Sequence, residues 1–297
     1  MTALTSLIKR NNKIFFKDKG MLITSLITPM ILLVLYATFL ARVYEDAFTA
    51  SVPPEFSFDK SIINGLVGGQ LVSSLLAVSC VTVSFCSNLL MVQDKISGAR
   101  RDLTVSPVKA QTLSLAYFIS SASVTMLISL VALFAGLVYL AFTGWYLSFS
   151  DVFLLLFDII LLVLFATSLS SIINCSLKSN GQASAVGTIV SSGYGFICGA
   201  YMPISNFPEV LQHIVLFLPG TYGTSLLRNH AINGVYAEMK KKGLPAEVIE
   251  EIRDATDINL YFFDNPVSEW VMYLVLAGSV VLISAAYVLL CKRKKMR

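Results

Sequence analysis

The chain alternates between long apolar stretches and shorter polar segments. Six stretches stay apolar over about 20 residues or more, which is the length a helix needs to cross the hydrocarbon core of a bilayer. Membrane strands would instead alternate apolar and polar residues over about ten positions. The pattern therefore predicts an all-α membrane protein with six transmembrane helices, at roughly 21–41, 61–92, 113–142, 149–175, 183–202 and 269–291.

The residues before the first span have a different pattern. Apolar side chains recur close to one helical face with Lys and Arg between them, which is typical of a helix lying in the membrane interface. The apolar positions are Leu4, Leu7, Ile8, Ile14 and Phe15. We expect residues 1–20 to form a cytoplasmic amphipathic interfacial helix and residues 21–297 to form the six-span transmembrane domain. A solvated helix with an ordinary core face is the alternative.

The segment between the fifth and sixth spans has two parts. Pro203, Pro208 and Pro219 divide the first part into apolar pieces too short to cross a bilayer, which predicts re-entrant helices. The second part, about 235–265, is polar and indicates an external insertion. Within it, Pro245 followed by AEVIEEIRDA predicts a short solvated helix that begins near the proline.

Composition and charge agree with a membrane protein. The chain is 56% hydrophobic and only 13% charged, whereas about a quarter of the residues in a soluble domain are charged. Fifteen of its 22 Lys and Arg residues fall at the chain ends and in loops that would share one membrane face. The positive-inside rule makes that face cytoplasmic and places both termini inside the cell. The basic tail, CKRKKMR, is then a topology anchor near lipid headgroups and not a nucleic-acid site.

The sequence offers no arrangement suited to catalysis or metal binding. A Walker A loop needs Gly-Lys, which does not occur in the chain, so the chain should not hydrolyse ATP itself. The five cysteines and the two histidines, His213 and His230, do not follow metal-ligand spacing. We therefore expect no cofactor in this chain. A membrane enzyme acting on lipid would need paired acids or a histidine–acid set on one face, and neither is evident.

One acidic residue, Asp158, lies deep within a predicted span. An ionisable side chain there marks a functional site by default, so an ion-coupled secondary transporter using Asp158 is the alternative function. A protonated or hydrogen-bonded packing residue is the other interpretation of Asp158. The predicted spans offer no Lys, Arg or His as its partner. No inverted sequence repeat, which many secondary transporters contain, is evident.

The second and fifth spans carry small residues at about every fourth position, which lets helices approach closely. Packing within the chain is one interpretation of these faces. A dimer seam, or a path for a transported molecule, is the other. On that second interpretation the path residues are Gly69, Gln70, Ser73, Ala77, Asp158, Gly187, Ser191 and Gly195.

Residues 198–228, CGAYMPISNFPEVLQHIVLFLPGTYGTSLLR, combine small residues, three prolines, an acid and an arginine. Their order resembles the signature region of ABC-2-type permeases, the membrane subunits of ATP-binding-cassette exporters. The matching positions are Gly199, Pro203, Pro208, Glu209, Pro219 and Arg228. The segment 93–108, QDKISGARRDLTVSPV, is similar to the first cytoplasmic loop of that family, although Gln93, Asp94 and Lys95 replace its usual acid-Arg-acid start.

This resemblance implies partners and roles. The chain would act as one of two permease copies, identical or related, joined to ATPase subunits that hold ATP and Mg. The 93–108 loop would contact the ATPase through Asp94, Lys95, Gly98, Arg100, Arg101, Asp102, Leu103 and Pro107. The outer gate would be formed by the six signature residues of 198–228. The cargo would be an amphipathic or hydrophobic drug, antibiotic, toxin or lipid-like molecule, exported across the cell membrane.

Overall fold

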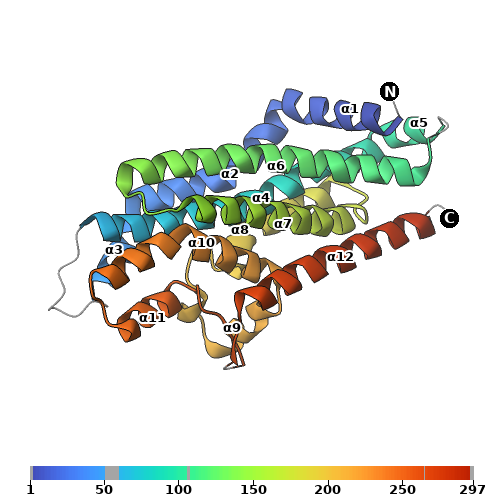
Figure 1. Ribbon diagram of the computed structural model, residues 1–297. Helices are drawn as coiled ribbons and strands as arrows, with labels where there is room; N and C mark the ends of the chain where they lie inside the picture. Colours follow the sequence, from blue (N-terminus) through green and yellow to red (C-terminus); the bar gives the residue numbers. More distant parts are fainter. Residues whose placement is uncertain (1–2, 51–59, 106–107, 264, 295–297) are drawn as a thin grey trace.

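The computed structural model describes residues 3–50, 60–105, 108–263 and 265–294 (Figure 1). Helices make up nearly all of this part of the chain, and its two strands are two residues long. The elements are α1 (Ala3–Lys17), α2 (Lys19–Leu35), η1 (Tyr36–Leu40), α3 (Ala41–Ala50), α4 (Lys60–Ile96), α5 (Ala99–Val105), α6 (Ala110–Thr143), α7 (Phe149–Asn174), α8 (Asn180–Ile197), η2 (Ile204–Asn206), α9 (Glu209–Leu216), α10 (Pro219–Lys241), α11 (Ala246–Ala255), β1 (Tyr261–Phe262), β2 (Asn265–Pro266) and α12 (Glu269–Lys294).

Within the described residues, five helices are long and apolar enough to cross a membrane. They are the 28-residue run Lys19–Asp46, which includes α2 and η1, and the helices α4, α6, α7 and α12. A sixth span results if the pair α9 and α10, bent by 92°, is counted as one. This confirms the all-α membrane fold, with a bent helix pair where re-entrant helices were predicted.

The helix α8 lies where the fifth span was predicted, but it is not among those five helices. It has 18 residues, and Asn180 and Gln182 together with several serines and glycines lower its hydropathy. The Ser179 side chain accepts the N–H of Gln182 and so caps the start of α8. The predicted span 183–202 therefore corresponds to a helix that is more polar than its neighbours.

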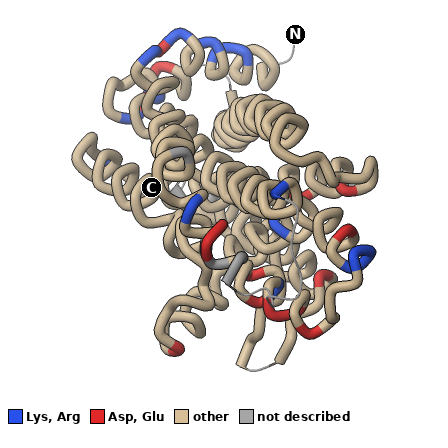
Figure 2. Tube along the Cα trace, turned by 90° about the vertical axis from the view of Figure 1, so that its left-hand side faces the viewer, with Lys and Arg blue, Asp and Glu red and all other residues tan. Residues whose placement is uncertain are grey.

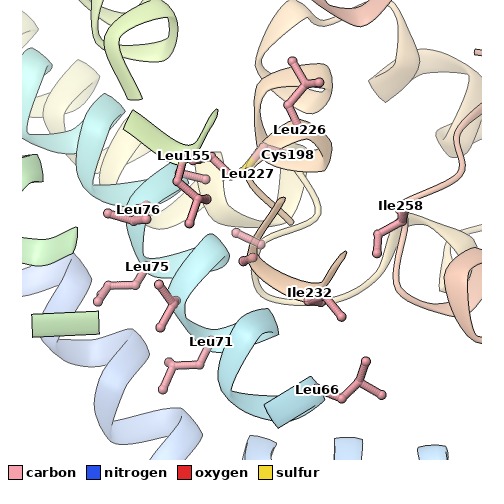
Figure 3. Close-up of a cluster of buried hydrophobic side chains, with 14 of the residues drawn as sticks. Leu66, Leu71, Leu75, Leu76, Leu155, Cys198, Leu226, Leu227, Ile232 and Ile258 are labelled. Atoms are coloured by element: carbon pink, nitrogen blue, oxygen red, sulfur yellow. The ribbon is translucent and has the colours of Figure 1, made fainter. Parts of the chain in front are cut away.

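The 37-residue helix α4 forms the centre of the molecule. It is about 55 Å long at 1.5 Å per residue, and 94% of the residues in its most apolar stretch are buried. The helices α2, α6, α7, α8 and α10 all pack against it. Figure 3 shows leucines of α4 meeting apolar side chains of α7 and α10, among them Leu66, Leu71, Leu75, Leu76, Leu155, Leu226, Leu227 and Ile232.

The two ends of the long helices differ in what surrounds them. The N-terminus, α5 and the C-terminal end of α12 lie at one end, whereas α3 and α11 lie towards the other (Figure 1). The helix α1 buries Leu7, Asn11 and Phe15 against the bundle and exposes Lys9 and Lys13. Figure 2 shows the basic residues of α1 gathered near the N-terminus. The structure thus gives the N-terminal helix the amphipathic character that its sequence predicts.

Glycine on α4 allows the close approach of α10. A Cβ atom at Gly69 would lie 2.7 Å from Cγ1 of Ile232 and 3.0 Å from the carbonyl oxygen of Ala231. Such contacts are too short for a methyl group, so only glycine fits there without movement of α10. In contrast, a Cβ atom at Gly187 of α8 would meet nothing within 4 Å. The small-residue face of α4 serves packing at Gly69, whereas that of α8 is open at Gly187.

We predict opposite effects of alanine at these two glycines. Gly69→Ala should lower the Tm of the purified protein, because overpacking typically costs about 1–3 kcal/mol. Gly187→Ala is the matched control and should leave Tm unchanged or raise it, because alanine favours a helix by about 1 kcal/mol over glycine. Thermal unfolding in detergent measures both variants. Equal shifts would contradict the packing described for α4 and α10.

Candidate functional site

A groove of about 1090 Å³ runs between the first span and α8. Apolar side chains of the first span form one wall, and small or hydroxyl-bearing residues of α8 form the other. These wall residues include Ile27, Ile31, Leu35, Phe39, Ser184, Gly187, Thr188 and Ser191. Among the described residues that line the groove there is no Lys, Arg, Asp or Glu. The groove can therefore hold a molecule that is largely apolar and carries few polar groups.

The structure separates the predicted path residues into two groups. Gly187 and Ser191 line the groove, and Gly195 lies against the ring of Tyr201, which also lines it. The second group lies on α4, is buried, and does not line the groove; it consists of Gly69, Gln70, Ser73 and Ala77. Of the two helices that were predicted to form a path, only α8 brings predicted path residues to the groove, whereas α4 reaches it with Cys86 and Leu89.

Asp158 has a histidine partner, which corrects the expectation that the spans offer none. Its Oδ2 lies 2.6 Å from Nδ1 of His230, and its Oδ1 accepts the hydroxyl of Tyr273 at 2.7 Å. Asp158 is 1% exposed and His230 is 5% exposed. The sequence predicted an interfacial or loop position for His230, whereas His230 lies on α10, a long helix packed inside the bundle. The sequence shows His230 itself, but it does not show that α10 is buried inside the bundle.

The Asp158 cluster belongs to a row of polar contacts that joins α10 to α7 and α12. On α10, Asn229 donates to Glu269 of α12 at 2.6 Å, and Asn233 donates to Asp151 of α7 at 3.0 Å. Asp151 also caps the start of α7 through a capping box with Ser148. None of these side chains lines the groove. These hydrogen bonds hold α7, α10 and α12 together.

The predicted gate residues lie in the segment from the end of α8 to Arg228 of α10. Gly199 follows α8 with a φ of +73°, a conformation that favours glycine. Pro203 lines the groove. Pro208 and Glu209 begin α9, and Pro219 begins α10 at the 92° bend, where its fixed φ suits the first turn of a helix. The prolines thus lie where the chain changes direction.

Arg228 and Asp257 form the buried ion pair that holds these turns. Nη1 of Arg228 donates to Oδ2 of Asp257 at 3.1 Å and to the carbonyl oxygen of Thr256 at 2.9 Å. Its Nη2 donates to the carbonyl oxygen of Gly199 at 2.8 Å. Arg228 is 1% exposed and Asp257 is 3% exposed. One guanidinium therefore joins the end of α8, the helix α10 and the polar insertion that contains Asp257.

The carboxylate of Asp257 also binds the loop after α8. It accepts the backbone N–H of Ile204 at 2.7 Å and that of Ser205 at 3.2 Å. Burial raises the pKa of the Asp257 carboxyl, while Arg228 and the two N–H groups act in the opposite direction. Nothing in the sequence singles out Asp257, because all the acids of the polar insertion look solvated from the sequence alone. Its φ of +54°, which aspartate tolerates better than most residues, is visible only in the fold.

At the other end of α4, two predicted contact residues are engaged inside the chain. Asp94 accepts two bonds from Arg10 of α1, at 2.6 and 2.9 Å, and one from the Tyr117 hydroxyl at 2.6 Å. The hydrogen bonding between Arg10 and Asp94 raises the pKa of the Arg10 guanidinium. Lys95 donates to the carbonyl oxygens of Asn174 and Cys175 at the end of α7. Asp94 and Lys95 thereby connect α4 to α1 and α7.

The remaining predicted contact residues lie on or beside the short helix α5. Gly98 turns the chain between α4 and α5 with a φ of +84°. Arg101 and Asp102 are exposed, and Arg100 and Leu103 are partly exposed. Leu103 packs against the apolar cluster that includes Leu7 and Phe15 of α1. Pro107 lies outside the described residues.

Comparison with known proteins gives one family. The sequence model described as ABC-2 type transporter matches residues 2–230, which include α1, the 93–108 segment, the groove walls and Arg228. No curated protein sequence matches the chain. The matched range ends before the insertion that supplies Asp257.

We predict that removal of the Asp257 carboxylate destabilises the outer end of the molecule. Asp257→Ala should cost about 3–5 kcal/mol, because it leaves the Arg228 charge buried without its partner. Asp257→Asn should cost less, since its amide oxygen can still accept one of the two backbone N–H groups, which bond different carboxylate oxygens. Glu251→Ala, at an exposed position of α11, is the control. A fall in Tm that is no larger for Asp257→Ala than for the control would refute this assignment.

Asp158→Asn tests whether the Asp158 cluster has only a structural role, which is to hold α7, α10 and α12 together. We expect a loss of about 1–3 kcal/mol in stability, because the bond to His230 is weakened, together with an unchanged pH dependence of transport. Tyr273→Phe, which removes one bond to the same carboxylate, should give a smaller loss. Thermal unfolding and transport assays between pH 5.5 and 8.5, roughly the range in which histidine titrates, measure both effects. A shifted pH profile in Asp158→Asn would point to ion coupling instead.

Proposed function

The chain belongs to the ABC-2 type transporter family, and we propose that it exports an amphipathic or hydrophobic molecule with energy from a separate ATPase. As a member of that family it is a multi-pass membrane permease and a non-catalytic transport subunit. The observation that carries the proposal is the groove between the first span and α8, with its apolar wall and no charged residue among the described residues that line it. Drugs, antibiotics, toxins and lipid-like molecules have the matching chemistry.

The proposed contact with the ATPase is centred on α5. Arg101 and Asp102 are exposed there, and charge-assisted hydrogen bonds from such side chains are strong. The bonds of Asp94 to Arg10, and those of Lys95 to the end of α7, support a different role for these two residues. They would pass the movement of α5 into α1, α4 and α7. The contact itself would then involve Arg100, Arg101, Asp102 and Leu103.

The proposed cycle uses α4 as a rigid lever. ATP binding would bring two ATPase subunits together beneath two permease copies and displace α5. Because α4 is buried on all sides, that displacement would shift α4 as a body against its neighbours. The groove between the first span and α8 would open as a result. The loop held by Arg228 and Asp257 would then act as the outer gate.

The orientation is part of the same proposal. The basic helix α1, the loop with α5 and the C-terminal end of α12 share one end of the molecule, which we place in the cytoplasm (Figure 1). The acidic helix α11 would then lie outside the cell. The bonds of Asp158 to His230 and Tyr273, away from the groove, lend no support to the ion-coupled alternative.

Charge reversal at Arg101 tests the proposed coupling. In vesicles that contain the permease and its ATPase, Arg101→Glu should lower ATP-driven export by about tenfold or more, since one charge-assisted bond is worth about 1.5–3 kcal/mol. Deletion of 97–103 should abolish export while the protein remains in the membrane. Lys240→Glu, exposed near the end of α10, is the matched control and should export normally. Full export by Arg101→Glu would defeat the assignment of α5.

A further inference from the structure

Four buried polar side chains meet beside the outer half of the groove. They are Tyr36 of η1, Tyr44 of α3, and Gln70 and Ser74 of α4, each no more than 6% exposed. The Tyr36 hydroxyl lies near Tyr44 and Ser74, and the Tyr44 hydroxyl lies near the Gln70 amide. Within the described residues these approaches fall short of hydrogen-bond geometry, and neither hydroxyl, neither amide atom of Gln70 nor the Ser74 hydroxyl has a partner that meets it.

Such a cluster is costly unless something completes it. A buried donor or acceptor without a partner costs about 1–3 kcal/mol, and buried polar side chains are nearly always hydrogen-bonded. Elsewhere on α4 the Asn88 amide nitrogen donates to Ser170 and Ser171, and Ser87 bonds Ser121, whereas the Ser79 hydroxyl and Oδ1 of Asn88 have no partner among the described residues. The cluster of Tyr36, Tyr44, Gln70 and Ser74 gathers five such atoms in one place. It lies beside η1, a π-helical turn, and such turns are frequent at functional sites.

Tyr44 connects this cluster to the groove. It lines the groove wall together with Phe48 and Val43, and it stacks on Tyr36 at 5.8 Å between ring centroids. A molecule in the groove whose polar group reaches Tyr44 would find the Gln70 amide next to it. The apolar side chains of Ile31 and Leu35 line the wall nearer the cytoplasmic end and suit a hydrocarbon portion.

From this geometry we propose that Tyr36, Tyr44, Gln70 and Ser74 form a binding subsite for an uncharged hydrogen-bonding group, such as an amide or a hydroxyl, of an amphipathic cargo. The proposal rests on the export function above and specifies its cargo. Gln70 and the hydroxyls can each donate and accept, which suits an amide. A charged group would find no counter-ion among the described residues, because those that line the groove carry no charge and the nearby Arg228 is paired with Asp257.

Matched probes with one twelve-carbon chain test the subsite. Tritiated dodecanamide is bound to the purified permease in lipid nanodiscs, and empty nanodiscs give the background. Unlabelled dodecanamide, dodecylammonium, dodecanoate and dodecane then compete. We expect saturable binding that the amide displaces at the lowest concentration. Equal displacement by either ion or by dodecane would overturn the proposal. The absence of saturable binding would overturn it as well, because a second copy or lipid would then fill the groove.

Two variants locate the binding. Gln70→Leu and Tyr44→Phe should each weaken dodecanamide binding by about three- to tenfold, the range expected for one hydrogen bond, and leave displacement by dodecane unchanged. Tyr44→Phe keeps the ring and so keeps the packing. Tyr139→Phe is the matched control, because it also removes a phenolic hydroxyl. Tyr139 lies exposed on α6 and does not line the groove, so this variant should bind dodecanamide normally. An equal loss for the amide and dodecane in both variants would overturn the subsite.

The outcome separates the subsite from the export function. Binding of dodecanamide without ATP-driven export from vesicles that contain the ATPase would leave the subsite in place and refute the exporter. Export of other amphiphiles without saturable binding of dodecanamide would refute the subsite and leave the exporter standing.

Discussion

The burial of α4 on all sides is the constraint on which the rest of the structure depends. Inside a bilayer no water is available to its polar side chains, so neighbouring helices or a bound molecule must satisfy them. In its C-terminal half, Ser84, Ser87 and Asn88 bond serines of α6 and α7. In its N-terminal half, Gly69 lets α10 pack closely. The C-terminal end of the same helix leads to the proposed ATPase contact on α5.

Two ion pairs of different kinds hold the bundle. At the C-terminal end of α4, Arg10 and Asp94 join α1 to α4, with Arg10 partly exposed. Beside the loop after α8, Arg228 and Asp257 are both buried and fix backbone turns as well as each other. Breaking a fully buried pair is more costly than breaking a partly exposed one. The Arg228–Asp257 pair is thus the more costly of the two to break, which suits the proposed gate if it opens only when driven.

Sequence patterns predicted the long apolar helices, the amphipathic α1, the bend near Pro219 and the helix after Pro245, because each depends on local periodicity or on proline geometry. They did not predict that His230 meets Asp158 or that Asp257 meets Arg228. Those contacts join residues 72 and 29 positions apart, and only the packing of α10 against α7 and against the insertion brings them together. The role of the small residues was equally invisible, since identical spacing gave close packing at Gly69 and open space at Gly187.

The most direct test of the account is the distance across the groove compared with the length of α4 during the ATP cycle. Spin labels at Ile31 and Thr188 report the groove, and labels at Lys60 and Ser97 report the two ends of α4; all four positions are exposed. Each pair is measured by double electron–electron resonance in vesicles with the ATPase and excess unlabelled permease. We predict that ATP binding changes the Ile31–Thr188 distance and leaves the Lys60–Ser97 distance unchanged. A constant groove distance, or a change in the length of α4, would contradict the lever mechanism.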